Sequence, residues 1–341
     1  MYIAIGLILE LAPGALAQFP PGEGERPTSQ QSPADDQHGP TTRAVERPGV
    51  TLPRIGPASM PASRPAGAGP AAFQPGVRID WKAREVRVDG LVSITAEPVE
   101  FIACFEGKEH ESVVLLRAAA AHVYMAMGLI GLEPGEPPTW DEKAEKVTPA
   151  RGELISVEFE WREGETLHRA AWTDWVREVT YGRTPIPRPM IFAGSRVRRD
   201  GVLWADVSGA GAALVQMPEC LISVSRVLSD LEGDLWAIAN TAALPPPGTP
   251  VEMIVKAAEA PAVEATLDFR GDLRLAGGRY CSVADFADLV DLRRRQRPDD
   301  VTVVRVDGAM PSDVERLKRA LKAAELAEGA VRVEAGDKGT K

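Results

Sequence analysis

The chain has 341 residues, of which 44% are hydrophobic, so it is long enough for more than one domain with an apolar core. Its formal net charge of -10 argues against nucleic acid as a partner, because phosphates require a basic binding face. The three cysteines, Cys104, Cys220 and Cys281, form no CxxC pair, which argues against zinc and iron–sulfur sites. Two alternatives stay open for them: one disulfide with a spare thiol, or three buried thiols.

The first residues predict export. An apolar stretch from Tyr2 to Leu16 ends at Ala15-Leu16-Ala17, the A-x-A pattern of a signal peptidase site, and it is too short to span a bilayer. We therefore predict a signal peptide over residues 1–17, a periplasmic or cell-envelope location, and no transmembrane helix after its removal. Proline and glycine dominate residues 18–75, which predicts a disordered linker, and residues 336–341 are predicted to be a disordered tail.

Residues 76–256 carry the pattern of a β-rich domain with few helices. Apolar and polar residues alternate over Val77–Trp81 and Glu85–Val88, and most clearly over Leu154–Trp161. Short strands are also expected at Val202–Ala205 and Ala213–Met217. One helix is expected over residues 118–129, so the predicted class is α+β.

Residues 262–335 predict a second, smaller domain. Alternating residues make a hairpin, Ser282 caps a helix, and residues 301–306 form a buried strand. Ser312 and Glu315 have the spacing of a capping box for a second helix, which a last strand follows. The order ββαβαβ predicts a two-layer α/β domain, whose last strand and hairpin edge can pair with a partner by strand addition.

The larger domain resembles the YdjY-domain family. The resemblance rests on "PVEFIACFEGKEHESVVLL" at 98–116, "MGLIGLEPGEPP" at 127–138, "IFAGS" at 191–195 and "PPPGTPVEMIV" at 245–255. The biochemical role of that family is not established, so the resemblance implies the identity of the domain and no activity.

The smaller domain resembles the periplasmic domain of the ExbD/TolR family. The resemblance rests on the segments "LDFRGDLRLAGGRYCSVADFADLV" and "PDDVTVVRVDGAMPSDVERLKRALKAAEL". Together they follow that family's order of hairpin, helix, strand and helix. Those proteins also have a membrane helix with an aspartate that couples to proton flow, and no such segment is found in this sequence. The resemblance therefore implies a soluble interaction module without the proton-driven role.

His110, Glu111 and Ser112 are the first candidates for a site. A functional interpretation makes His110 a general base or metal ligand that Glu111 orients. Adjacent residues on an extended strand point to opposite faces, however, and no HxH, HExxH or HxxxH spacing supplies a second histidine. We therefore favour a polar corner at the start of a strand, and we assign no catalytic residue, metal ligand or cofactor.

Three further residues complete the candidate binding surface. Ser195 lies in Ala193-Gly194-Ser195-Arg196, which lacks the G-x-S-x-G pattern of a nucleophile elbow and is more typical of a tight turn. Trp172 and Trp175 are three residues apart; exposed, they would form a platform for a sugar or peptide, and buried, they belong to the core. The core interpretation is favoured.

Together these features predict an exported cell-envelope protein that binds a protein or polymer partner and has no catalytic activity. The alternative is a redox or metal-dependent accessory enzyme of the envelope, with its site near His110 and Glu111. The oligomeric state stays open.

Overall fold

The computed structural model describes residues 69–141, 146–226, 236–324, 326 and 329–335. The predictions of a signal peptide at 1–17 and of a tail at 336–341 lie outside the described residues, as does most of the predicted linker. The described part is rich in strands and has four α-helices, which confirms the prediction of a β-rich chain with few helices.

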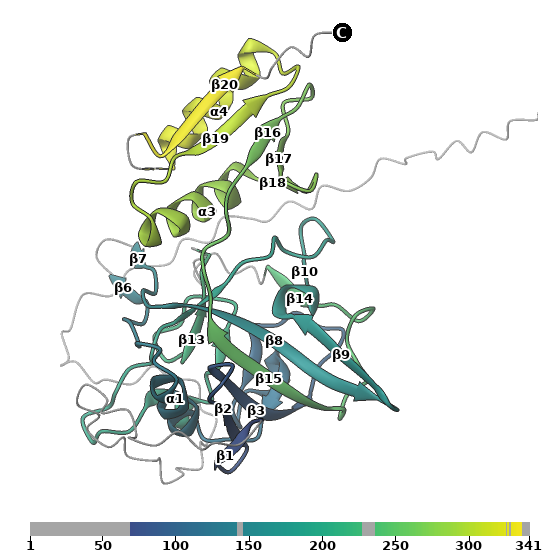
Figure 1. Cartoon of the computed structure of the whole chain (residues 1–341), viewed down its shortest axis with the longest axis vertical. Helices are drawn as coiled ribbons and strands as arrows, with labels where there is room; N and C mark the ends of the chain where they lie inside the picture. The colour runs from purple at the N-terminus through teal and green to yellow at the C-terminus, as the bar shows by residue number, and fades with distance from the viewer. Residues whose placement is uncertain (1–68, 142–145, 227–235, 325, 327–328, 336–341) are drawn as a thin grey trace, which may run out of the picture. The chain divides into compact units, whose positions relative to one another are not determined.

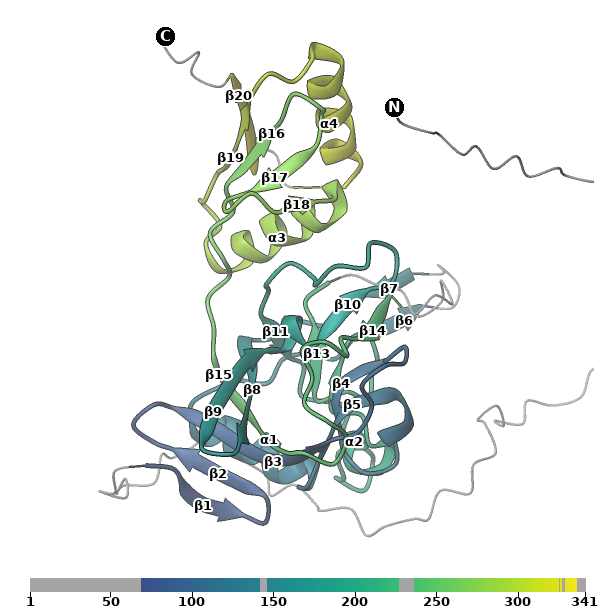
Figure 2. The same ribbon diagram turned by 90° about the vertical axis from the view of Figure 1, so that its right-hand side faces the viewer.

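Eight strands of the N-terminal part form a closed sheet, because β3 pairs with β15 on one side and with β5 on the other. The strands follow one another round the sheet in the order β3 (Glu85–Val92), β15 (Pro250–Ala257), β8 (Leu154–Glu163), β11 (Met190–Phe192), β13 (Ile222–Val224), β12 (Ala212–Ala213), β4 (Phe101–Cys104) and β5 (Ser112–Leu116). Among these neighbours, only β12–β13 and β4–β5 are parallel. Figures 1 and 2 show the N-terminal part from two directions. Closure removes the free edges that an open sheet would expose.

Shorter strands extend or flank this sheet. β2 (Val77–Asp80) pairs with the first half of β3, β1 (Ala71–Gln74) pairs with β2, and β9 (Thr166–Ala171) pairs with the second half of β8. Two small antiparallel pairs lie outside it: β10 (Val176–Glu178) with β14 (Ala237–Ala239), and β6 (Thr139–Asp141) with β7 (Lys146–Thr148).

The linker was predicted to end at residue 75, but ordered structure begins before that residue, with strand β1 at Ala71–Gln74. β1 is ordered because Phe73 packs against the main apolar core, and because Gly76 turns the chain into β2. Gly76 has a φ of 72°, and a Cβ there would lie 1.9 Å from the carbonyl oxygen of Arg117. Only glycine allows both the turn and the close approach.

Strand β11 is buried against apolar residues on both of its faces. Met190 and Phe192 belong to the larger core cluster, whereas Ile191 belongs to a second cluster with Phe101. Helix α1 (Ala120–Leu129) packs against β2 and β3 and adds Met127 to the larger cluster. A strand buried on both sides reads as a continuous apolar run, as "MIF" does at β11.

Two short strands of the prediction are wrong. Residues 202–205 lead into helix α2 (Trp204–Ser208), because the hydroxyl oxygen of Ser195 accepts a hydrogen bond from the Ala205 N–H and so caps the helix. The strand expected at Ala213–Met217 ends at Ala213, because the Gln216 side chain bonds to the backbone of Ala150 and Val224. Neither side-chain bond can be read from local sequence.

The C-terminal part is a five-stranded sheet with two helices on one face. Its strands run in the order β18 (Tyr280–Cys281), β17 (Leu273–Leu275), β16 (Ala265–Leu267), β19 (Thr302–Val306) and β20 (Val331–Ala335). The helices are α3 (Val283–Gln296) and α4 (Pro311–Ala323). Phe286 of α3 and Leu317 of α4 share one core cluster with Val304 of the sheet, so both helices cover the same face. No helix or strand of the described residues covers the other face of the sheet, which we call the open face.

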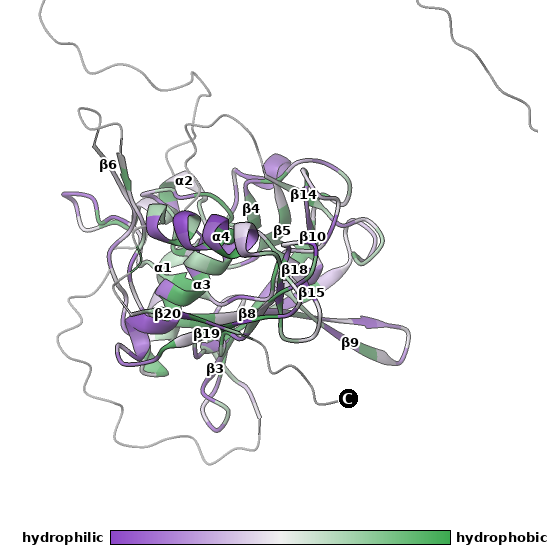
Figure 3. Cartoon of the chain, turned by 90° about the horizontal axis from the view of Figure 1, so that it is seen from above, coloured by the Kyte–Doolittle hydropathy of each residue, from purple (hydrophilic) through white to green (hydrophobic). Residues whose placement is uncertain are grey.

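The N-termini of α3 and α4 are stabilised in two different ways. The Oγ of Ser282 accepts a hydrogen bond from the Asp285 N–H at 3.0 Å, as predicted for the cap of α3. The capping box predicted at Ser312 is wrong, because α4 begins at Pro311, whose fixed φ suits the first helical position. Glu315 instead pairs with Lys318 on the outer face of α4, which Figure 3 shows as mostly hydrophilic.

A chain of ion pairs joins the segment before β11 to helix α3. Arg188 Nη2 lies 3.1 Å from Asp285 Oδ1, and the two side chains are only 3% and 1% exposed. Arg226 Nε lies 3.3 Å from the same oxygen, and its Nη1 lies 3.5 Å from Glu178 Oε1. Ile186, two residues before Arg188, packs into the core cluster of α3. Buried charges of this kind are tolerated only because each has a partner.

Candidate functional site

The His110 segment is a single turn of 3₁₀ helix, Glu109–Glu111, and not the start of a strand. The expectation that strand geometry separates His110 from Glu111 is therefore wrong, yet the two still barely meet, at 3.9 Å from Nε2 to Oε2. His110 is 75% exposed, and Glu111 pairs with Lys108 at 2.5 Å. Ser112 is buried and donates to the Lys108 carbonyl oxygen at 2.7 Å. The segment is held by local polar contacts of a surface corner.

Ser195 lies in the left-handed region, with a φ of 60°, and is almost fully buried. Its hydroxyl donates to the Glu219 carbonyl oxygen at 2.7 Å and accepts from the Ala205 N–H at 3.1 Å. These bonds fix the strained turn between two loops. The hydroxyl is thus used within the fold.

Trp172 and Trp175 are both inside the core. Trp175 stacks on Phe159 with a centroid distance of 4.4 Å and an interplanar angle of 9°, and Trp172 donates its Nε1–H to the Arg188 carbonyl oxygen at 2.9 Å. Neither indole offers the open platform that binding a sugar or peptide would require. The six candidate residues do not converge on one cavity of the described structure.

The three cysteines are free and buried. Burial raises the pKa of each thiol to about 12, from an ordinary value of 9.0. Raised values of this kind keep the thiols protonated and unreactive at neutral pH. Among the described residues, no group of three or more histidine, cysteine, aspartate or glutamate side chains is arranged to hold a metal ion.

We therefore expect all three thiols to resist modification by a maleimide at pH 8 while the protein is folded, with Cys281 reacting first because it is the least buried. Mass spectrometry of the intact protein counts the adducts, and denaturant should expose every thiol. Because the folded-state pKa lies above the ordinary one, the associated stability is complete below pH 9 and declines as the pH rises toward 12. Fast native labelling, or the mass of a disulfide, would contradict the burial.

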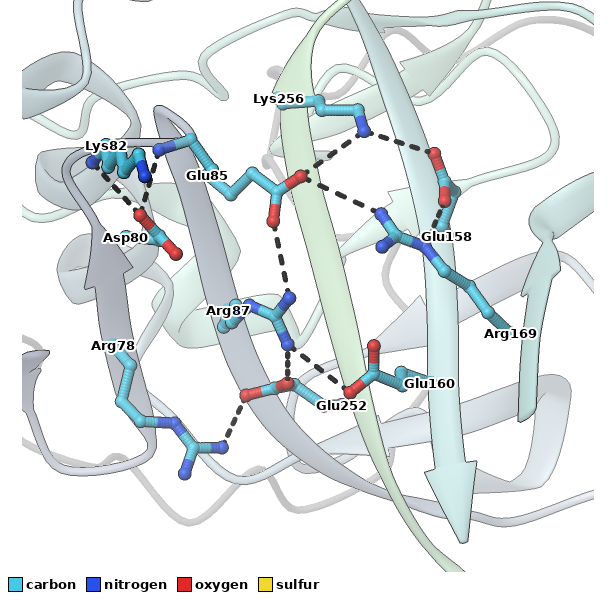
Figure 4. A network of polar contacts seen from close by, with 11 residues as sticks. Arg78, Asp80, Lys82, Glu85, Arg87, Glu158, Glu160, Arg169, Glu252 and Lys256 are labelled. Carbon is cyan, nitrogen blue, oxygen red and sulfur yellow. Dashed lines mark hydrogen bonds and ion pairs between the residues drawn. The ribbon is translucent and has the colours of Figure 1, made fainter. Parts of the chain in front are cut away.

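A large polar cluster was not anticipated from the sequence. It covers the outer side of β2, β3, β15, β8 and β9, and we call it the charged face (Figure 4). Its members are Arg78, Glu85, Arg87, Asp89, Glu158, Glu160, Arg169, Glu252 and Lys256. The signal for it is the spacing of two between charges within β3 and β8, as in Glu85-x-Arg87-x-Asp89.

Register brings these charges together across strands that are far apart in sequence. Glu252 of β15 lies opposite Asp89 of β3 and Glu160 of β8, and such acids would repel one another. Arg87 Nη1 and Arg78 Nη2 each lie 2.5 Å from a Glu252 oxygen and compensate for this repulsion. Burial lowers the pKa of Arg87, but the hydrogen bond and charge of Glu252 outweigh it and leave the pKa above its ordinary value.

The same side chains cover an apolar residue. Ile254 faces outward between Arg87 and Glu158 in register, yet it is only 1% exposed. Long charged side chains can bury apolar surface under their methylene stems while their head groups stay in water. Every cation of the charged face has a carboxylate partner within the face. The charged face therefore stabilises the sheet and leaves no unpaired cation for an anionic ligand.

The open face of the C-terminal sheet is more suited to binding. A shallow cavity of about 620 Å³ lies there, lined by Thr266, Phe269, Arg274, Val303 and Arg305 among others. Phe269 is 64% exposed, and Arg274 is held by Asp268 at 3.0 Å and by the Tyr280 ring. Arg305 has no ion-pair partner in the described part of the chain. The Arg270 guanidinium lies 5.3 Å from the centre of the Phe269 ring, whereas Arg305 lines the same cavity without an ion-pair partner among the described residues. A cavity lined by an exposed aromatic ring and an unpaired guanidinium is an unusual surface for a protein to leave uncovered.

The architecture of the N-terminal part is that of a β-rich domain built on a closed eight-stranded sheet with parallel and antiparallel neighbours. The model of one family, the YdjY domain, matches residues 77–256, which is more than half of the chain, and this chain belongs to that family. No curated protein and no solved structure matches it. In the ranges that the structure describes, no helix is long and apolar enough to cross a membrane.

Proposed function

We propose that this chain is an exported cell-envelope protein that acts by binding a partner protein. The observation that carries the proposal is the open face of the C-terminal sheet, where Phe269 and Arg305 flank a cavity of about 620 Å³. Export is supported by the A-x-A pattern at Ala15-Leu16-Ala17 in the sequence.

The chemistry of the open face indicates the kind of ligand. An unpaired guanidinium favours a carboxylate, and an exposed phenyl ring favours an apolar side chain. Thr266 and Val303 also line this cavity and give it a floor that is partly polar and partly apolar, over which an extended segment can lie. The proposed ligand is an extended acidic peptide segment with one large apolar side chain.

The C-terminal part is proposed to be a soluble interaction module like the periplasmic domain of ExbD/TolR proteins. Its support is the order of elements, a hairpin of β16 and β17, then α3, β19, α4 and β20, with the short β18 added before α3. The YdjY model ends before this part, at residue 256, so the module is additional to the family domain.

A photo-cross-linking residue placed at Phe269 in the native host should give a discrete adduct with one envelope protein. Adding Arg305→Glu should reduce that adduct severalfold, because the carboxylate of the ligand would then be repelled. The matched control places the same cross-linker at Leu167 of β9, which is also exposed but far from the cavity in sequence and sheet. Equal adducts at both positions, or no effect of Arg305→Glu, would sink the proposal.

The alternative of a redox or metal-dependent enzyme near His110 gains no support from the geometry. The His110 side chain is exposed to solvent, and its neighbour Glu111 already forms an ion pair with Lys108. A general base needs a substrate cavity within hydrogen-bond reach, and none of the three cavities described includes either residue.

A further inference from the structure

We propose that a basic and apolar patch on helix α2 and the loop before it binds the surface of an anionic phospholipid bilayer. The patch, which we call the α2 patch, consists of Arg196, Val197, Arg198, Arg199, Trp204 and Val207. It belongs to the N-terminal part and shares no residue with the cavity on the open face of the C-terminal sheet. The inference is therefore independent of the peptide ligand proposed above.

Three apolar members of the α2 patch are exposed to solvent. Val197, Trp204 and Val207 are 56%, 40% and 41% exposed. The Trp204 N–H donates to the Arg196 carbonyl oxygen at 2.8 Å, and Val197 forms a β-bridge with Leu203, so the loop folds back beside α2. Val207 follows Trp204 by about one helical turn and lies on the same side of α2. Apolar side chains that gather on a surface mark an interaction site.

The basic members of the α2 patch come from the same loop. Arg196 and Arg199 are exposed, and neither forms an ion pair within the described residues. The Arg198 guanidinium lies 5.8 Å from the centre of the Trp204 ring, and its Nη2 lies 3.2 Å from Asp200 Oδ2. The cation–π contact places a guanidinium on the same side of the loop as the exposed indole. Two arginines of the patch are thus available for anionic groups outside the chain.

The acidic residues of this segment do not cancel its charge. Asp200 is paired with Arg198, and the Asp206 carboxylate of α2 accepts a hydrogen bond from the Ala121 N–H at 3.3 Å, which turns it toward the start of α1. The whole chain has a net charge of -10, which repels an anionic surface at long range. At physiological ionic strength, however, the Debye length is only about 8 Å, so a bilayer in contact with the patch interacts mainly with the patch.

The composition of the α2 patch fits a lipid surface. Tryptophan prefers the boundary between head groups and acyl chains, where its ring is buried and its N–H stays among polar groups. Arginine binds phosphate through two parallel hydrogen bonds, and its methylene stem can cover apolar surface. A bilayer is fluid and adapts to protruding side chains, whereas a peptide segment needs a groove, and none of the three cavities described includes a member of the patch. The proposed ligand is therefore a bilayer that contains an anionic phospholipid such as phosphatidylglycerol.

The test measures binding to vesicles by co-sedimentation. It uses the chain from Gln18 onward, which keeps every residue that the structure describes and lacks the apolar segment Tyr2–Leu16, because that segment can bind lipid by itself. At low ionic strength this chain should bind vesicles of phosphatidylglycerol and phosphatidylcholine in equal parts, but not vesicles of phosphatidylcholine alone. High salt should release it, because salt screens the attraction between arginine and lipid phosphate.

Variants of the α2 patch identify the binding surface. Arg196→Glu combined with Arg199→Glu should weaken binding by about twenty-five-fold or more, because each basic residue near an anionic bilayer raises the affinity about fivefold. Trp204→Ser should weaken binding severalfold and remove the quenching of tryptophan fluorescence by spin-labelled lipids. Trp204→Phe should keep most of the affinity, because a phenyl ring can still enter the boundary region.

The matched control is Arg162→Glu combined with Arg319→Glu, which changes the net charge by the same amount at two exposed arginines outside the patch. It should bind almost as well as the unmodified chain, and circular dichroism checks that every variant is folded. Absence of binding by the unmodified chain, or equal losses in the patch and control variants, would overturn the inference. So would a photo-cross-linking residue at Val207 that captures one envelope protein, or a second copy of this chain, while vesicles stay unbound.

Discussion

Replacing Arg188 with alanine is expected to lower the free energy of unfolding by about 3 kcal/mol. Asp285 would stay buried, with a side chain only 1% exposed, and would lose its partner at 3.1 Å. Removing one member of a buried pair typically costs about 3–5 kcal/mol, because the remaining charge is left without compensation. We expect the lower end of that range, since Arg226 and the Ser282 hydroxyl also contact Asp285, at 3.3 Å and 2.8 Å.

The measurement is urea denaturation followed with two probes. All seven tryptophans lie before residue 257, so their fluorescence reports on the YdjY domain, while far-UV circular dichroism also reports on the long helices α3 and α4. Because Arg188 and Asp285 come from the two different parts, both signals should shift to lower urea concentration.

Two controls separate the buried pair from charge in general. Arg295→Ala removes an exposed pair with Asp291 on the same helix α3 and should cost only about 0.5 kcal/mol. Arg188→Met combined with Asp285→Leu removes both charges and should recover most of the loss, because no unpaired charge is left in the interior. Equal losses for Arg188→Ala and Arg295→Ala would show that burial of the pair is unimportant.

Replacing Trp175 with alanine is expected to cost about 3–5 kcal/mol, the range for removing a large aromatic side chain from a core. Trp175 is fully buried, is stacked on Phe159 and lies 5.4 Å from the Trp161 ring. The loss combines the transfer energy of the indole with the cavity that it leaves. Thermal or urea unfolding measures it.

Conservative substitutions at the two buried tryptophans should differ in a way that isolates one hydrogen bond. Trp175 Nε1 has no hydrogen-bond partner among the described residues, whereas Trp172 Nε1 donates to the Arg188 carbonyl oxygen. Trp172→Phe should therefore cost about 1–3 kcal/mol more than Trp175→Phe, because it leaves that buried oxygen unpaired. If Trp175→Phe proved the costlier of the two, the buried arrangement of the indoles would be wrong. Acrylamide should quench neither indole strongly.

Local patterns were sufficient where one stretch of chain decides its own structure. The alternation at Leu154–Trp161 gave β8, and Ser282 followed by apolar residues at helical spacing gave α3. Local patterns failed where a distant residue decides. Trp204–Ser208 is helical because Ser195 caps it, and the linker boundary moved because Phe73 finds a core to pack against.

The candidate site residues show the same limit of local patterns, which do not predict contacts between distant residues. His110, Glu111 and Ser112 were chosen by residue type, but type alone does not tell whether side chains converge. The charged face was missed because its members come from five strands, and Arg87 and Glu252 are 165 residues apart. Their contact depends on the register of β15 against β3, which is a property of the closed sheet.

By itself, the sequence determined the β-rich class of the chain, the membership of residues 77–256 in the YdjY family, and the cap of α3. These follow from periodicity and side-chain type, which act over a few residues. Only the tertiary structure decided the closure of the sheet through β3 and β5, the burial of both tryptophans, and the pairing of Arg188 with Asp285. These depend on long-range register and burial, which bring together residues that no local pattern relates.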